Sequence, residues 1–73
     1  MKLGKEIAQI RKDNSMTQEA FGQIFHVTRQ TVSNWENEKS YPDLETLVAI
    51  SDRFGISLDT LLKEDEHMIQ TID

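Results

Sequence analysis

Apolar residues recur every three or four positions along most of this chain, and short polar stretches separate the runs. This spacing places the apolar side chains of each run on one face of a helix. The pattern therefore predicts an all-α domain of five helices, which cover residues 3–13, 18–25, 29–36 and 44–54 and a short segment that begins at 58.

Helix-capping residues mark the predicted boundaries. Thr17, Thr28, Asp43 and Ser57 each precede a predicted helix, where a side-chain oxygen can accept a hydrogen bond from a free backbone N–H. Gly55 follows the fourth helix, in the position where glycine commonly ends one. These residues predict the helix ends separately from the apolar pattern.

The inward faces of the predicted helices form one small core. In the helix over residues 44–54, the expected inward residues are Leu44, Leu47, Val48, Ser51 and Phe54. The inward position of Trp35 favours core packing over a role in stacking on bases. The other helices contribute Leu3, Ile7, Ile10, Ala20, Phe21, Ile24, Phe25, Val32, Trp35, Leu58, Leu61 and Leu62.

Residues 18–37 are predicted to form two short helices joined by a tight turn. Gly22 lies where the two helices come closest, and a side chain there would push them apart. When Val32 and Trp35 point inward, at about 100° per residue, the opposite face of the second helix carries amides, a hydroxyl and a guanidinium. These groups can form paired hydrogen bonds with the edges of bases.

Three runs follow one another in order, namely TQE at residues 17–19, TRQTVSNWEN at 28–37 and KSYPDL at 39–44. Together they resemble the Cro and lambda-repressor type of helix-turn-helix regulator, the XRE family. The resemblance extends over residues 3–62. His26 stands where this family usually has a turn glycine, Glu38 where it often has glycine, and Gly22 where it usually has alanine.

The resemblance implies a compact five-helix lambda-repressor-like DNA-binding domain whose second and third helices form the helix-turn-helix. Its expected partner is double-stranded DNA, bound by a homodimer with one recognition helix in each major groove. The expected role is that of a transcriptional regulator, by default a repressor on a palindromic operator. The alternative is a protein-interaction or antitoxin-like module that retains the fold.

Two sets of residues are the predicted DNA contacts. Residues of the first set contact bases, and each good pairing contributes about 1–3 kcal/mol of discrimination. The alternative for this first set is a solvated face. Residues of the second set contact phosphates and position the domain. The base-contacting set is Arg29, Gln30, Ser33 and Asn34, and the phosphate-contacting set is Gln18, Thr28, Asn37 and Lys39.

A further pair is predicted to be structural. The resemblance implies an ion pair between Arg11 and Glu36, which would neutralise a carboxylate close to the DNA backbone. Removing one partner of such a pair leaves a poorly compensated charge. For Thr28, a cap on the second helix of the motif is by itself enough to explain the hydroxyl.

The net charge of −5 over 73 residues is unusual for a DNA-binding protein, but the acidity is unevenly distributed. Residues 1–39 hold six basic and five acidic side chains, whereas residues 40–73 carry a net charge of −6. The predicted DNA-binding domain covers residues 1–63. The tail over 64–73 is acidic and then apolar, and Ile69 and Ile72 could extend a stripe from Leu58 and Leu62. The alternatives are a frayed tail, a helix that covers a partner, or the start of a further segment of a longer regulator.

Several classes of function have no residues to support them. There is no cysteine, no apolar run of membrane-spanning length and no signal peptide, so the expected location is the cytoplasm. No arrangement of nucleophile, base and orienting group is present, and the phosphate-binding loop is absent. His67 follows three acidic tail residues, a pattern that rarely builds a metal site. We therefore predict no enzymatic activity, cofactor, metal or small-molecule ligand.

Overall fold

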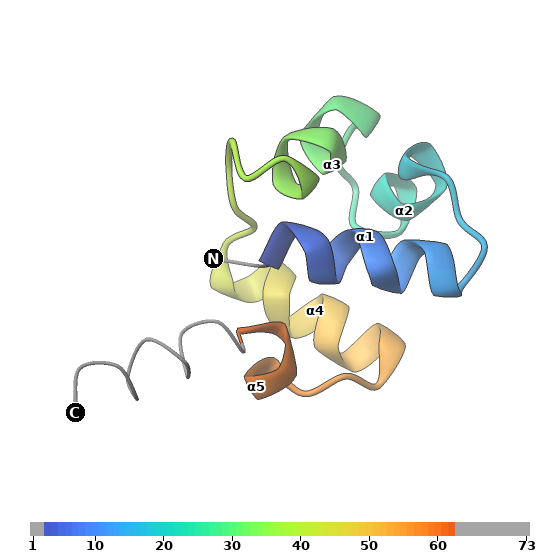
Figure 1. The fold of residues 1–73 in the computed structure, drawn as a ribbon. Coiled ribbons are helices and arrows are strands. Elements are labelled where there is room, and N and C mark those ends of the chain that lie inside the picture. The colour runs from blue at the N-terminus through green and yellow to red at the C-terminus, as the bar shows by residue number, and fades with distance from the viewer. Residues whose placement is uncertain (1–2, 63–73) are drawn as a thin grey trace.

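Five helices form the part of the chain that the computed structural model describes, residues 3–62 (Figure 1). The five-helix all-α prediction is confirmed. Among the first four helices, only the second has different bounds from those predicted, because it ends one residue earlier. The predicted tail over residues 64–73 lies outside the described residues. The helices are α1 (Leu3–Asp13), α2 (Gln18–Ile24), α3 (Arg29–Glu36), α4 (Leu44–Phe54) and α5 (Leu58–Leu61).

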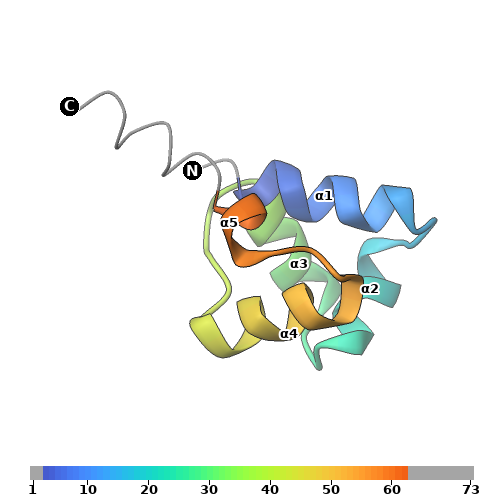
Figure 2. The same ribbon diagram turned by 90° about the horizontal axis from the view of Figure 1, so that it is seen from below.

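The helices lie on both sides of α1. In Figure 1, α2 and α3 stand above α1, and α4 and α5 lie below it. The view from below shows α4 and α5 on the near side, with α3 behind them (Figure 2). The outer side of α2 and α3 is therefore exposed in Figure 1, on the other side of α1 from α5.

Each predicted cap is present. The side-chain oxygens of the four residues accept hydrogen bonds from backbone N–H groups three positions later, at 2.9–3.1 Å. Gly55 ends α4 in the left-handed conformation, with φ of 64°. The capping pairs are Thr17 with Ala20, Thr28 with Thr31, Asp43 with Thr46 and Ser57 with Thr60.

Residues from all five helices form a single core around three aromatic rings. Phe21 is fully buried, and its ring stacks on that of Phe54 with 5.7 Å between centroids and lies 5.0 Å from that of Phe25. Val32 and Trp35 are buried as predicted. The fully or nearly buried apolar residues are Leu3, Ile7, Ile10, Phe21, Val32, Trp35, Leu47, Ile50 and Leu61.

The predicted inward face of α4 is partly wrong. Leu44 is 70% exposed and Val48 39% exposed, whereas Ile50, which was not predicted to point inward, is completely buried. The buried face instead runs through Leu47, Ile50 and the half-buried Phe54. The segment LETLVAI offers two apolar stripes of similar strength, so periodicity alone cannot choose between them.

In two turns, a residue other than glycine adopts the left-handed backbone conformation. Both positions are ones where the Cro and lambda-repressor type of regulator usually or often has glycine. His26 has φ of 60° between α2 and α3, and Glu38 has φ of 61° just after α3. This region is sterically unfavourable for a residue with a Cβ atom, typically by about 1 kcal/mol or more. Both residues therefore store some backbone strain.

Replacing His26 with glycine is expected to stabilise the domain by about 1 kcal/mol. The His26 side chain is exposed, so little packing is lost when it is removed. Urea denaturation of the parent and the His26→Gly variant measures the difference. Gln23→Gly, at an exposed site inside α2, is the control and is expected to destabilise, because glycine lowers helix propensity. An unchanged or lower stability of His26→Gly would contradict the expectation.

Candidate nucleic-acid interface

The angle between α2 and α3 depends on a close backbone approach at Gly22. A Cβ atom on Gly22 would lie 2.6 Å from the carbonyl oxygen of Val27 and 3.3 Å from that of Thr28. The Val27 N–H also donates a hydrogen bond of 2.9 Å to the Gly22 carbonyl. The tight turn thus joins the two helices through main-chain atoms, and it fixes where α3 begins.

The four predicted base-contacting residues lie on one side of α3, away from the core. Arg29 and Gln30 are exposed, and Ser33 and Asn34 are half-buried. The Gln30 side chain donates a hydrogen bond of 3.1 Å to the side-chain oxygen of Asn34. This contact uses one N–H and one lone pair, so each amide keeps further hydrogen-bonding capacity for a ligand.

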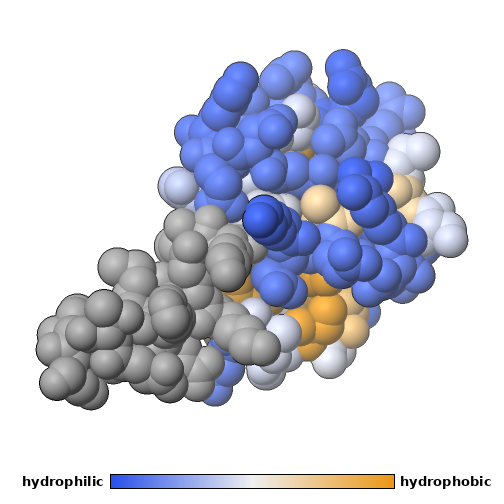
Figure 3. Space-filling model, viewed as in Figure 1, coloured by the Kyte–Doolittle hydropathy of each residue, from blue (hydrophilic) through white to orange (hydrophobic). Residues whose placement is uncertain are grey.

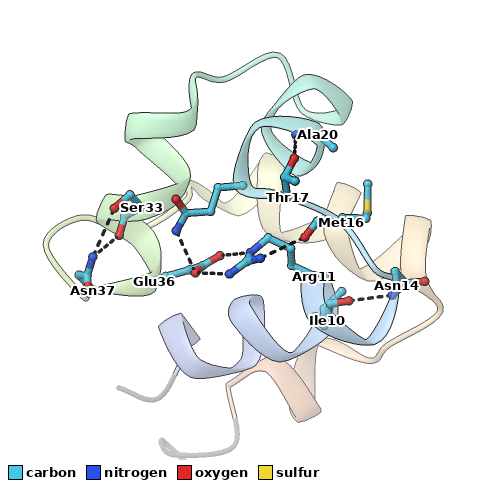
Figure 4. A network of polar contacts seen from close by, with 10 residues as sticks. Ile10, Arg11, Asn14, Met16, Thr17, Ala20, Ser33, Glu36 and Asn37 are labelled. Carbon is cyan, nitrogen blue, oxygen red and sulfur yellow. Dashed lines mark hydrogen bonds and ion pairs between the residues drawn. The ribbon is translucent and has the colours of Figure 1, made fainter.

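The end of α3 carries the predicted contacts Asn37 and Lys39, both exposed. The Asn37 amide folds back along the helix and donates to the Ser33 carbonyl at 2.9 Å and to its hydroxyl at 3.3 Å (Figure 4). The Lys39 backbone N–H donates to the carbonyl of Asn34 at 2.9 Å. The backbone at Lys39 is therefore tied to the last turn of α3.

At the N-terminal ends of the two helices, the structure gives Gln18 and Thr28 contacts within the protein. Gln18 is half-buried, and its side-chain amide donates a hydrogen bond of 3.1 Å to the Glu36 carboxylate. The Thr28 hydroxyl accepts from the Thr31 N–H and lies 3.1 Å from the Thr31 hydroxyl. The capping role of Thr28 is thus present, and a phosphate contact would have to share the same oxygen.

Arg11 and Glu36 face each other between α1 and α3 (Figure 4). Arg11 Nε lies 2.8 Å from Glu36 Oε2, Arg11 Nη2 donates to Glu36 Oε1 at 3.1 Å, and Arg11 Nη1 donates to the Met16 carbonyl at 3.0 Å. Burial raises the pKa of Glu36, but the hydrogen bonds from Arg11 and Gln18 outweigh it and hold that pKa below its ordinary value. The carboxylate is therefore ionised and neutralised by its partner.

The two ends of the molecule differ in the character of their surfaces. In Figure 3 the surface over α3 is mostly hydrophilic and paler atoms appear toward α2, whereas the most strongly apolar atoms gather below α1. On the α2 and α3 side, Arg29 and Lys39 are exposed cations, Glu19 is an exposed anion, and the charge of Glu36 is compensated. A polar face with cations suits an anionic, hydrogen-bonding ligand better than an apolar one.

Sequence reasoning missed one polar contact beside this face. The Glu38 carboxylate accepts a hydrogen bond from the backbone N–H of Gly4, at the start of α1. The only available signal was a glutamate at a position where the Cro and lambda-repressor type of regulator often has glycine. It did not indicate the partner, because Gly4 is 34 residues away in sequence.

Among residues 3–62, no group of His, Cys, Asp and Glu side chains could hold a metal ion. None of the helices in this part of the chain is long and apolar enough to cross a membrane.

Comparison with known proteins agrees with this geometry. A family model described as helix-turn-helix, HTH_3, matches residues 7–61. The transcriptional activator BcrR of Enterococcus faecalis is 35% identical over 66 residues, which are 90% of this chain and 32% of BcrR. The transcriptional regulator ImmR of Bacillus subtilis is 32% identical over 66 residues, 90% of this chain and 52% of ImmR.

A phage protein also matches. Repressor protein C2 of Salmonella phage P22 is 35% identical over 63 residues, which are 86% of this chain and 29% of C2. The chain thus spans between about a third and a half of the length of these relatives. The similarity concerns one domain that activators and repressors share.

Proposed function

Because the chain belongs to the XRE-type helix-turn-helix family of DNA-binding transcriptional regulators, we propose that it reads a specific duplex sequence with α3 in the major groove. The single observation that carries this proposal is the outward face of α3. Arg29, Gln30 and Asn34 there offer the guanidinium and amide groups that pair with guanine and adenine edges.

The proposed phosphate contacts flank this face. Lys39 follows α3, and the backbone N–H groups at the start of α2, where Gln18 stands, suit an anionic oxygen. Because the Gln18 amide donates to Glu36, a phosphate contact by this residue would use its backbone N–H or its second amide hydrogen. Asn37 and Thr28 complete the proposed set, and none of these four reads sequence directly.

On DNA the protein is proposed to act as a homodimer. Two copies would place their α3 helices in successive major grooves about one helical turn apart, so the operator would be roughly palindromic. Repression is the proposed default, since a bound dimer obstructs polymerase without needing a further contact surface. Of the relatives, BcrR is named an activator and C2 a repressor, which matches either outcome for a shared DNA-binding domain.

Selection of bound sites from a random DNA pool tests the proposal, followed by titration of the winning site and of random DNA at several salt concentrations. The Arg29→Ala change is expected to weaken binding to the selected site by about 1–3 kcal/mol, or roughly 5- to 150-fold, and binding to random DNA by less. Arg53→Ala is the matched control, because Arg53 is also exposed but belongs to α4 on the opposite side. Its effect on the selected site is expected to be small.

Two results would reject the proposal. The first is a selected site that binds no more tightly than random DNA. The second is equal loss of affinity in Arg29→Ala and Arg53→Ala, which would indicate a diffuse charge effect instead of base contact. If duplex affinity were also independent of salt, phosphate contacts would be absent, and the protein-interaction alternative would be favoured.

A further inference from the structure

The N-terminus of α1 meets the C-terminus of α3 at one tight contact. The Gly4 N–H donates to Glu38 Oε2. A Cβ atom on Gly4 would lie only 2.6 Å from the Trp35 carbonyl oxygen and 2.7 Å from that of Glu36. The main chain of α1 therefore rests directly on the last turn of α3, and only glycine leaves room for this approach.

Glu38 makes this contact from a strained backbone. Its φ of 61° is a conformation that glycine adopts more easily, so the backbone at this position is strained. A carboxylate at a helix N-terminus accepts a charge-assisted hydrogen bond and interacts favourably with the helix dipole. Its second oxygen, Oε1, is buried and has no hydrogen-bond partner among residues 3–62. The carboxylate is thus committed to the interior contact.

Glu36 and Glu38 together hold the end of α3 at two points along α1. Glu36 pairs with Arg11, and Glu38 binds Gly4. Gly4 and Arg11 are seven residues apart, which is about 10 Å along a helix. Two attachments at this separation restrain the tilt of α3 on α1, which a single attachment would leave to packing alone.

We propose that Glu38 is a positioning residue for DNA recognition. By joining the end of α3 to the start of α1, it sets the tilt of the recognition helix and the path of the backbone into Lys39. The Lys39 N–H is bound to the Asn34 carbonyl, so a shift at Glu38 moves a proposed phosphate contact and a proposed base contact together. This proposal rests on the proposed function in that α3 is the element that reads DNA.

Substitution of Glu38 separates positioning from two simpler roles by the sign of the effect. If Glu38 acted only through its charge, its removal would strengthen DNA binding, because a negative charge near phosphate is lost. If it acted only on stability, binding would not change well below the melting temperature. If it positions α3, binding weakens although a repulsive charge has been removed.

The test uses Glu38→Gly and Glu38→Asn in the full chain. Both residues tolerate positive φ, and glycine has no side chain to bind Gly4 while asparagine is one methylene shorter than glutamate. Each variant is expected to bind the selected site about 5- to 10-fold more weakly at 25 °C, with a salt slope lowered by about one phosphate contact. Asp43→Asn is the control, since it removes one carboxylate and keeps a good helix cap. Its binding is expected to be unchanged or slightly tighter.

A second readout needs no DNA. Amide hydrogen exchange of Lys39, whose N–H is bonded to Asn34, is expected to accelerate at least 5-fold in Glu38→Gly after correction for the altered intrinsic rate, while the amides of the buried residues Leu47 and Ile50 in α4 keep their rates. Unchanged exchange at Lys39, or binding equal to or tighter than that of the parent, would overturn the positioning role. If the parent protein failed to prefer any DNA sequence, the proposed function would fail, and the exchange measurement would still decide whether Glu38 holds the end of α3.

Discussion

Replacing Arg11 with methionine is expected to lower the free energy of unfolding by about 3 kcal/mol. The two side chains of the Arg11–Glu36 pair are only 15% and 10% exposed, and Arg11 makes three hydrogen bonds, to Glu36 and to the Met16 carbonyl. Without Arg11, the Glu36 carboxylate stays between α1 and α3 with the Gln18 amide as its remaining side-chain hydrogen-bond donor and the charge of Lys12 nearby. Urea denaturation of the two proteins measures the difference.

A double variant distinguishes the loss of the pair from the loss of packing. Arg11→Met combined with Glu36→Gln removes the unpaired charge, so the double variant is expected to be more stable than Arg11→Met alone. Because the two residues are in contact, the coupling free energy of the cycle should reach at least about 1 kcal/mol. Strictly additive effects would show that the two side chains contribute separately.

The pair should also make stability depend on pH in a defined direction. Burial raises the pKa of Glu36, but the hydrogen bonds from Arg11 and Gln18 lower it by more than burial raises it. The pKa of Glu36 in the folded protein is therefore below its ordinary value of 4.5. A group whose pKa falls on folding stabilises the protein above its unfolded pKa, and this contribution is lost as the pH drops through its folded pKa. The parent should therefore lose more stability than Glu36→Gln below about pH 4.5. Asp43, whose pKa hydrogen bonds from Thr46 also lower, remains in both proteins and contributes equally.

Truncation of Phe21 to alanine is expected to cost about 3–5 kcal/mol, enough to unfold much of so small a domain. Phe21 is completely buried and lies at the centre of the aromatic cluster, against Phe25 and Phe54. Its removal would leave a cavity beneath α2 and α4 that backbone shifts cannot readily fill. Far-ultraviolet circular dichroism during urea titration measures the loss.

Leu44→Ala is the matched control for Phe21→Ala. Leu44 was predicted from its spacing to belong to the core, but it is 70% exposed. Its truncation is therefore expected to change stability by less than about 0.5 kcal/mol. A cost of several kcal/mol at Leu44 would contradict its exposed position and favour the inward face of α4 that the apolar spacing predicted.

The sequence by itself determined the helices, their ends except that of α2, and the helix-turn-helix. Caps such as Thr28 and Asp43 act through backbone groups three residues away, and Gly55 through its own φ, so these signals need no distant partner. The phase of α3 was equally clear, because Val32 and Trp35 are its only apolar residues. Polar residues on the rest of that helix could then only face outward.

The tertiary structure alone decided which face of α4 is buried and what Glu38 does. In α4 two apolar stripes were available, and packing against the rest of the core selected the one through Leu47 and Ile50. The contact of Glu38 with Gly4 joins residues far apart in the chain, at a place where backbone atoms of two helices meet. Local patterns encode the hydrogen bonds and dihedral angles of neighbouring residues. They do not indicate which distant helix end will lie close enough to accept or donate a hydrogen bond.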